Sequence, residues 1–370
     1  MKKAKLFSLA TVALTSTLVL AACGSSKSND GAKKDAAKDN KSVAIVTDVG
    51  GVDDRSFNQS AWEGLQAWGK ENGLKKGVGG YNYFQSDTES AYATNLNSAV
   101  QNGFKTIFGI GFKLSPEIKK AAAQNKDNNF GIIDSVIEGE DNVVSATFKD
   151  NEAAYLAGVA AAATTKTNKV GFIGGEEGVV IDRFEAGFVK GVEETAKKLG
   201  KTITVDVQYA GSFGDPAKGK AVAAQIYEGG ADIIFHASGG TGQGVFQEAK
   251  AIDEQLTEAE LKDKQVWVIG VDSDQQAEGA FKTKDGKDAN LTLCSTLKGV
   301  GAAVADISQK AADGKFPGGK HLVYGLKDGG VDSTCFLASS LKKPSVKSTP
   351  PSLRPYTKCL PPGNLPSAAF

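Results

Sequence analysis

Residues 43–71, VAIVTDVGGVDDRSFNQSAWEGLQAWGKE, decide the fold class. The run Val43–Thr47 is rich in β-branched residues and is typical of a strand buried inside a parallel sheet. The segment from Ser56 to Glu71 has apolar residues at helical spacing, among them Ala61 and Leu65. A buried strand followed by an amphipathic helix is the repeating half of a βαβ unit.

The same alternation continues along the chain. Further strands are predicted at Tyr81–Phe84, Thr106–Ile110, Phe130–Ile133, Val143–Phe148, Val170–Ile173, Ile203–Tyr209, Ile233–His236, Val266–Val271 and Leu291–Cys294. Helical stretches separate most of them, at Ser90–Asn102, Ser115–Gln124, Glu152–Thr165, Arg183–Leu199, Pro216–Tyr227, Gly242–Ile252 and Gly299–Ala312. Repeated βαβ units predict an α/β fold with parallel sheets covered by helices on both faces. Nine or more strands favour two doubly wound lobes.

Charge is unevenly distributed along the 370 residues, although the formal net charge is zero. Residues 1–23 and 333–370 contain eight basic and no acidic side chains. The segment 24–332 therefore holds 35 Lys and Arg against 43 Asp and Glu, a net charge of −8. An acidic body without a basic stripe argues against binding of nucleic acid.

No enzyme motif in the sequence is complete. The segment 200–202 (GKT) lacks the upstream glycine of a phosphate-binding loop, and residues 239–244 lack the G-x-G-x-x-G spacing of a dinucleotide turn. Two histidines and four cysteines without a C-x-x-C pair provide no metal site. Of Asp53 and Asp54, one is better explained by helix initiation than by acid–base chemistry. We therefore predict no catalysis, cofactor or metal, and a buried core thiol at Cys294.

The first 41 residues predict export and anchoring. A basic start and an apolar run end in Leu20-Ala21-Ala22-Cys23, which resembles the lipobox of bacterial lipoproteins. Residues 1–22 would be the signal peptide, and cleavage would leave Cys23 as the acylated N-terminal residue. Residues 23–41 contain nothing apolar larger than alanine after Cys23, so they predict a flexible tether. The folded part would begin near Ser42, at the extracytoplasmic face of the membrane.

Several predicted strands end in residues that suit ligand binding. In open α/β sheets, ligands bind beyond the carboxyl ends of the strands. Asp48, Asp134 and Asp272 stand at three of these ends, and the other ends are rich in glycine. Carboxylates accept hydrogen bonds from hydroxyls and amines, and short residues let backbone amides approach a ligand. This chemistry suits a neutral polyol or a nitrogenous ring and would repel a phosphate.

Six features together resemble the basic membrane protein family of lipoproteins. They are the lipobox with its tether, VTDVGGVDDRSFNQSAWEG (46–64), FGIID (130–134), FHASGGTGQGVF (235–246), VIGVDSDQ (268–275) and LTLCSTLKGVG (291–301). The members that the chain resembles most look like substrate-binding lipoproteins of ABC importers. The resemblance implies a class I periplasmic-binding-protein fold that closes two lobes on a purine nucleoside.

The resemblance also implies roles for eight residues. Phe57 and Phe213 would stack on the two faces of the base. Such stacking tolerates different ring systems. Asn58 and Asp134 would read ring nitrogens and exocyclic groups, with help from Asp48. Three further residues would hold the ribose: Asp272 by accepting from its hydroxyls, Gly240 through its backbone amide, and Lys298 by donating to its oxygens or pairing with Asp272.

A two-lobed receptor needs segments that cross between its lobes. We expect the first lobe to contain residues 42–148 and about 275–297, and the second to contain 149–274 and about 298–332. Crossings are expected near Phe148–Asp150, Asp274–Ala277 and Thr296–Lys298. Closure about such hinges is stabilised by the energy of ligand binding.

The last 38 residues differ from the body. Seven of the ten prolines and two of the four cysteines fall in residues 333–370, and no acid does. Family members continue here with a charged segment and a final helix. We interpret this segment as an out-of-frame or otherwise altered terminus and expect it to be disordered. A proline-rich extension that binds the cell wall is the alternative.

The leading hypothesis is a monomeric, lipid-anchored receptor without enzyme activity, which delivers purine nucleosides to the permease and ATPase subunits of an ABC importer. A receptor for a sugar or a furanose signal is an alternative within the same fold. An adhesin or regulatory lipoprotein is an alternative from another class. A nucleoside hydrolase would need an N-terminal cluster of metal-binding aspartates, which the sequence lacks.

Overall fold

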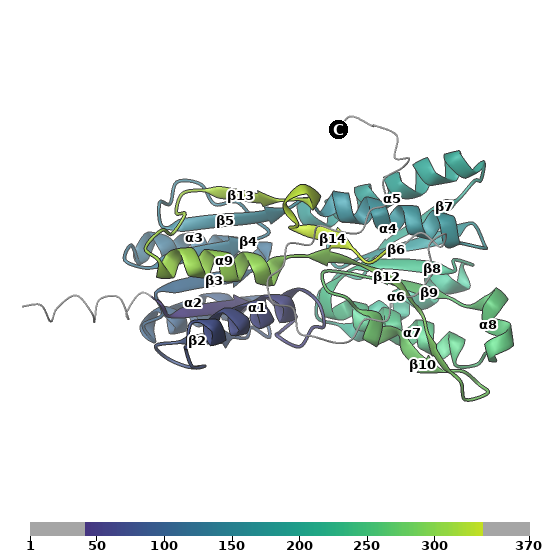
Figure 1. Ribbon diagram of the computed structural model, residues 1–370, viewed down its shortest axis with the longest axis horizontal. Coiled ribbons are helices and arrows are strands. Elements are labelled where there is room, and N and C mark those ends of the chain that lie inside the picture. Colours follow the sequence, from purple (N-terminus) through teal and green to yellow (C-terminus); the bar gives the residue numbers. More distant parts are fainter. Residues whose placement is uncertain (1–40, 336–370) are drawn as a thin grey trace, which may run out of the picture.

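The computed structural model describes residues 41–335 and contains two α/β lobes side by side (Figure 1). The first lobe has a six-stranded sheet in which every pair of neighbours is parallel. Its strand order is β13 (His321–Tyr324), β5 (Val143–Phe148), β4 (Asn129–Ile133), β3 (Thr106–Ile110), β1 (Val43–Thr47) and β2 (Tyr81–Phe84). The doubly wound α/β architecture predicted from the sequence is confirmed.

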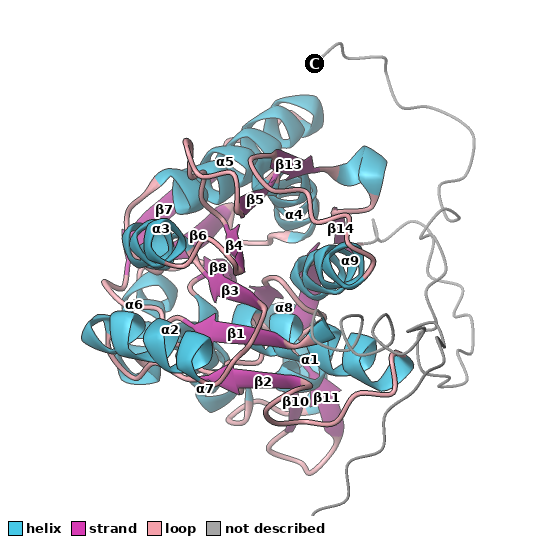
Figure 2. Ribbon diagram, turned by 90° about the vertical axis from the view of Figure 1, so that its left-hand side faces the viewer, coloured by secondary structure: helices cyan, strands magenta, loops and turns pink. Residues whose placement is uncertain are grey.

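Helices cover both faces of this sheet (Figure 2). On one face lie α1 (Phe57–Glu71) and α9 (Val300–Ala312), and on the other α2 (Tyr92–Gln101) and α3 (Ser115–Gln124). Strand β1 explains why both faces are apolar: Val43 and Ile45 pack toward α1 and α9, whereas Ala44 and Val46 pack toward the other pair. Successive side chains of a strand point to opposite faces, so a strand between two helical layers is apolar throughout.

The second lobe repeats this plan. Its strand order is β14 (Val331–Ser333), β12 (Thr292–Lys298), β9 (Trp267–Gly270), β8 (Ile233–Ala237), β6 (Lys169–Gly174) and β7 (Thr204–Tyr209). Only β14 is antiparallel to its neighbour. One face is covered by α4 (Asp150–Thr164) and α5 (Val179–Leu199), and the other by α6 (Pro216–Glu228) and α7 (Gly242–Asp253). Helix α8 (Glu258–Lys264) and a hairpin, β10 (Ala280–Lys282) with β11 (Asp288–Asn290), complete the lobe.

The predicted division into lobes is wrong for the last quarter of the body. Residues 275–297 belong to the second lobe, because β12 pairs with β9. Residues 300–324 belong to the first lobe, because β13 pairs with β5 and α9 packs on α1. The two helices approach so closely that a Cβ on Gly64 would lie 2.4 Å from the Cα of Gly301. Figure 1 shows both late elements, in yellow-green, among the purple and blue ones.

The chain crosses between the lobes three times. It crosses between Phe148 and Asp150, as predicted, and immediately after Lys298, next to the predicted segment. The third crossing joins β13 to β14 between Tyr324 and Val331, so the prediction at Asp274–Ala277 is wrong. In that segment the backbone N–H of Gln275 donates to the Ser295 hydroxyl of the same lobe.

The prediction of a free thiol at Cys294 is also wrong, because Cys294 forms a disulfide with Cys335. This bond links β12 to the segment that follows β14 and joins residues separated by 41 positions. The predicted signal peptide, the lipidated Cys23 and all of the tether but Lys41 lie outside the described residues, as does the tail from residue 336 onward. Within residues 41–335, no helix combines the length and apolar character that crossing a membrane requires.

Candidate functional site

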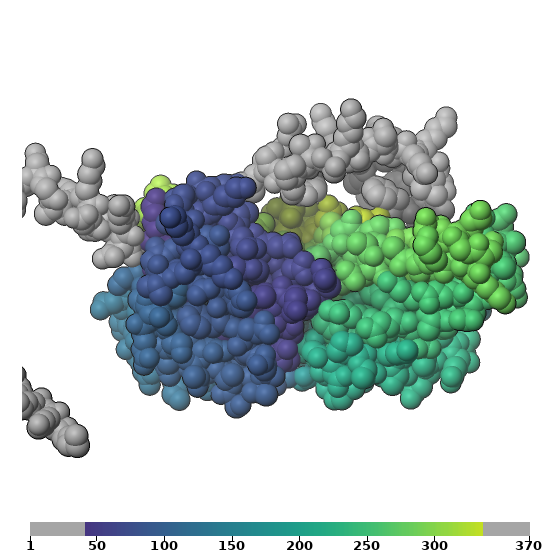
Figure 3. Space-filling model, turned by 90° about the horizontal axis from the view of Figure 1, so that it is seen from below, coloured from purple at the N-terminus to yellow at the C-terminus, as the bar shows by residue number. Residues whose placement is uncertain are grey.

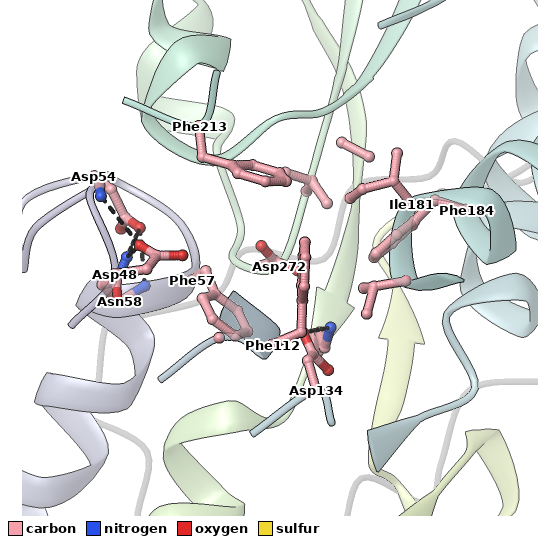
Figure 4. A pocket seen from close by; sticks show the side chains of 17 residues that line it. Asp48, Asp54, Phe57, Asn58, Phe112, Asp134, Ile181, Phe184, Phe213 and Asp272 are labelled. Atoms are coloured by element: carbon pink, nitrogen blue, oxygen red, sulfur yellow. Dashed lines mark hydrogen bonds and ion pairs between the residues drawn. The ribbon is translucent and has the colours of Figure 1, made fainter. Parts of the chain in front are cut away.

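A cleft lies between the lobes, at the carboxyl ends of the strands of both sheets (Figures 3 and 4). Its wall is formed in part by the segments that follow β1, β3, β4, β7, β8 and β9, and by the last residue of β12. Seven of the eight residues selected from the sequence line it: Asp48, Phe57, Asn58, Asp134, Phe213, Asp272 and Lys298. Gly240 does not line the cleft, whereas its neighbour Gly239 does.

Three polar residues of the first lobe form a connected group at one side of the cleft. The Asp54 carboxylate accepts backbone amide hydrogen bonds of 2.8–3.0 Å at the start of α1, which satisfies the donors that open a helix. It also accepts from the Asn58 side-chain nitrogen at 3.0 Å, and Asp48 accepts from the same nitrogen at 2.7 Å. Both amide hydrogens of Asn58 are thus used, and its side-chain oxygen is a buried acceptor without a partner.

Asp134 and Asp272 enter the cleft from opposite lobes with an unusual backbone. Their φ angles are +66° and +65°, in the left-handed region that non-glycine residues rarely adopt. Such strain persists where the surrounding structure enforces it, and it is concentrated at functional sites. Each carboxylate has one buried oxygen, Oδ1, without a hydrogen-bond partner. The other oxygen of Asp272 accepts from the Ser56 hydroxyl of the first lobe at 2.9 Å.

Lys298 is a buried cation at a crossing between the lobes. Its Nζ lies 2.6 Å from Asp134 Oδ2 in the first lobe and 3.0 Å from Asp150 Oδ1 in the second. Asp150 is in turn bound by the Arg183 guanidinium at 2.8 Å. The Lys298 ammonium also lies 5.2 Å from the centre of the Phe57 ring, within cation–π range. Its pairing with Asp134 rather than directly with Asp272 differs from the pairing expected from the sequence.

Aromatic and aliphatic side chains form the remaining walls. In Figure 4, Phe213 lies above the open space and Phe57 below it. Phe112 contacts Phe213 edge to face, with ring centres 6.1 Å apart. Ile181 and Phe184, from the first turns of α5, line the far side.

Sequence reasoning missed Phe112, Asp54, Ile181 and Phe184 as cleft residues. Phe112 directly follows the glycine-rich end of β3, so the strand-end rule could have found it. Ile181 was missed because the predicted helix began at Arg183, whereas α5 begins at Val179. Helix initiation was predicted for one of Asp53 and Asp54; the structure shows that it is Asp54, and adds its hydrogen bond from the Asn58 side chain.

The carboxylates of the cleft are only partly compensated. Burial raises the pKa of Asp272 to about 7, although Lys298 and the hydrogen bond from Ser56 lower it. Burial raises the pKa of Asp48 to about 6 against the hydrogen bond from Asn58, and it also raises the pKa of Asp134. Burial lowers the pKa of the Lys298 ammonium, but the surrounding carboxylates outweigh this effect and raise it. Hydrogen-bond donors on a ligand would stabilise the ionised carboxylates.

This arrangement is suited to holding a ligand with several donors. The side-chain atoms left without partners in the cleft wall are the acceptor oxygens of Asn58, Asp134 and Asp272. Among the described residues that line it, Lys298 is the only cation, and it is paired with carboxylates. Residues 41–335 contain no group of three or more His, Cys, Asp or Glu placed to hold a metal ion.

This chain is similar to known proteins over most of its length. A family model described as "ABC transporter substrate-binding protein PnrA-like" matches residues 41–348. The ABC transporter nucleoside-binding protein BmpA of Lactococcus lactis subsp. cremoris is 54% identical over 344 residues, covering 93% of this chain and 95% of that protein. The CD4+ T-cell-stimulating antigen of Listeria monocytogenes is 51% identical over 327 residues, covering 88% of each.

A solved structure shares the architecture. An ABC transporter solute-binding protein from Aeropyrum pernix K1 aligns with a TM-score of 0.68 and 26% identity, over 79% of this chain and 76% of that one. The similarity therefore extends through both lobes rather than one.

Proposed function

Because this chain belongs to the PnrA-like family of ABC transporter substrate-binding proteins, we propose that it captures purine nucleosides in the cleft between its lobes. The observation that carries the proposal is the set of three buried acceptor oxygens facing an aromatic-walled cleft. Nucleosides present ring and exocyclic N–H groups together with ribose hydroxyls, so they have donors for such acceptors. The name of the Lactococcus relative, a nucleoside-binding protein, supports the same reading.

The base would lie between aromatic side chains, with Phe57 and Phe213 on its two faces. Asn58, Asp134 and Asp48 would accept from its N–H groups. Stacking on an aromatic side chain contributes about 1–3 kcal/mol per base and is tolerant of ring identity. The two rings belong to different lobes, so a stacked base would hold the lobes together.

The ribose would lie toward Asp272 and Lys298. The unpartnered Asp272 oxygen would accept from a ribose hydroxyl. Lys298 would donate to a ribose oxygen while retaining its carboxylate partners. A 5′-phosphate would bring negative charge toward several carboxylates, and the described residues that line the cleft offer no unpaired cation to balance it, so nucleotides are expected to bind poorly.

Calorimetric titration of the purified mature protein tests the proposal. Guanosine and adenosine are expected to bind, guanosine monophosphate to bind at least about tenfold more weakly, and ribose or galactose not to bind. Phe213→Ala is expected to weaken nucleoside binding about tenfold or more, because one stacking face is lost.

The matched control is Phe316→Ala, which removes another half-buried loop phenylalanine that is not part of the cleft wall. It should leave affinity unchanged. Sugar binding without nucleoside binding would refute the proposal and favour the saccharide receptor.

We further propose that the protein works as a monomer anchored through acylated Cys23 to the outer face of the cell membrane. There the permease of an ABC importer would recognise its closed form, and the cognate ATPase would drive transport. Residues 1–23 support this placement by their sequence alone. The donor-rich ligand would arrive from outside the cell and leave through the permease.

Substituting Cys23 by serine tests the anchor. In cells expressing the native chain, the protein is expected in the membrane fraction and to partition into detergent. The variant is expected to lose the mass of the acyl groups and to leave that fraction, because acylation needs the thiol. An unchanged mass and membrane location in the variant would contradict the anchor.

A further inference from the structure

An ion pair joins the two lobes at the edge of the cleft, away from the segments where the chain crosses. Lys113 belongs to η3 (Phe112–Leu114) of the first lobe, directly after β3. Its Nζ lies 2.5 Å from Glu176 Oε2, in the loop that follows β6 of the second lobe. None of the three crossings contains either residue, so this contact exists only when the lobes approach each other.

Lys113 is held in place by its own lobe before it reaches across. Its Nζ lies 2.6 Å from Glu89 Oε1, which also belongs to the first lobe. The Lys113 side chain is only 18% exposed, whereas the Glu176 side chain is 31% exposed. Glu89 therefore orients the ammonium, and Glu176 adds an interaction that opening of the cleft would break.

The same short helix contacts the loop that would cover the ligand. Lys113 Nζ lies 5.9 Å from the centre of the Phe213 ring, and Phe112 touches that ring edge to face. The Phe213 loop also approaches a second segment of the first lobe, the one after β1, because a Cβ on Gly214 would lie 2.9 Å from the carbonyl oxygen of Val49. Phe112 and Lys113 thus hold the Phe213 loop over the cleft.

We propose that Lys113 and Glu176 form a latch between the lobes, in which Lys113 acts as a positioning residue that keeps Phe213 over the bound ligand and slows its release. The proposal rests on the proposed nucleoside function, and it adds a residue that acts through Phe213 rather than on the ligand itself. A contact formed only in the closed state acts on dissociation. The association rate is set by the open state, in which Lys113 pairs with Glu89 alone.

Stopped-flow kinetics with guanosine test the latch. Lys113→Met and Glu176→Gln are each expected to raise the dissociation rate about fivefold, with association unchanged within about twofold. The double variant is expected to match Glu176→Gln alone, because either change removes the same contact. Added salt should speed release from the native protein and have little effect on release from the variants.

The matched control is Lys126→Met, since Lys126 pairs with Glu140 inside the first lobe. It should leave both rates unchanged. Equal effects of Lys126→Met and Lys113→Met would overturn the latch. So would unchanged dissociation in both latch variants, or additive effects in the double variant.

A second measurement separates failure of the latch from failure of the ligand assignment. The distance between spin labels at positions 120 and 254, exposed sites on different lobes, needs no ligand. The latch predicts a larger share of open molecules in Lys113→Met and Glu176→Gln than in the native protein. If both variants are more open but the native protein binds no nucleoside, the latch is supported and the nucleoside function is refuted. Guanosine binding with unchanged distances and rates would refute the latch alone.

Discussion

Replacing Lys298 by methionine is expected to lower the free energy of unfolding by about 3–5 kcal/mol near neutral pH. The side chain is 3% exposed and lies between the carboxylates of Asp134 and Asp150, which are 5% and 0% exposed. Methionine would fill most of the volume but leave those carboxylates without their shared cation. Removing one partner of a buried ion pair costs much more than the net stabilisation of the intact pair, because a charge remains buried. Urea unfolding followed by circular dichroism measures the change.

The same variant should show a distinct dependence on pH. Lys298 lowers the pKa of both Asp134 and Asp272, so its removal raises them further above their unfolded values. A carboxyl group with a raised folded-state pKa stabilises the fold at low pH, and this contribution is lost as the pH rises through that pKa. The deficit of the variant should therefore be largest near about pH 8 and shrink toward about pH 5.

Lys310→Met is the control for this prediction. Lys310 also pairs with an aspartate, Asp306, but its side chain is 44% exposed and the pair lies within one turn of α9. Its removal should cost less than about 0.5 kcal/mol. A Lys298→Met protein as stable as the control would show that the buried network does not stabilise the fold. A deficit that does not change with pH would show that the loss does not come from the carboxyl groups of Asp134 and Asp272.

The second large effect is expected at the disulfide. Cys335→Ser is expected to reduce the free energy of unfolding by about 2–4 kcal/mol, because the bond closes a long loop and so restricts the unfolded chain. The bond also ties the segment after β14 to β12, the strand with which β14 itself pairs at the edge of the second sheet. Thermal unfolding by calorimetry gives the difference.

A reducing agent provides the internal control for the disulfide. Dithiothreitol should lower the melting temperature of the native protein to that of Cys335→Ser and leave the variant unchanged. If the native protein melts at the same temperature with and without the reductant, the bond does not contribute to stability.

Two properties of parallel α/β sheets made the sheets and most of the cleft predictable from the sequence. Strands buried between two helical layers are apolar throughout, as in VAIVT, so β1 and the central strands stand out from polar turns. Parallel strands bring their carboxyl ends to one edge, so Asp48, Asp134 and Asp272 converge although they are far apart in the chain. The short edge strands β13 and β14 and the β10–β11 hairpin were missed because they are half exposed and lack that apolar signal.

Other features depend on which element packs against which, and this cannot be read from local pattern. β12 has the same buried character as a first-lobe strand, and only its pairing with β9 assigns it to the second lobe. The disulfide of Cys294 needed the position of Cys335, which the pattern placed in a disordered tail. The place of Phe112 after β3 could have marked it as a cleft residue, but its contact with Phe213 depends on the approach of the opposite lobe.

The late return of α9 and β13 to the first lobe has a consequence for the order in which the protein can be built. Everything between Asp150 and Lys298 must leave the ribosome before α9, which shares one face of the first sheet with α1, and before β13, which completes the edge beside β5. Before Val300 each sheet lacks one edge strand, β13 in the first lobe and β14 in the second, but the first lobe also lacks the helix α9 that packs on α1. A ribosome that stops before Val300 would release a chain whose earliest residues, rather than its latest, are the ones left to chaperones and proteases.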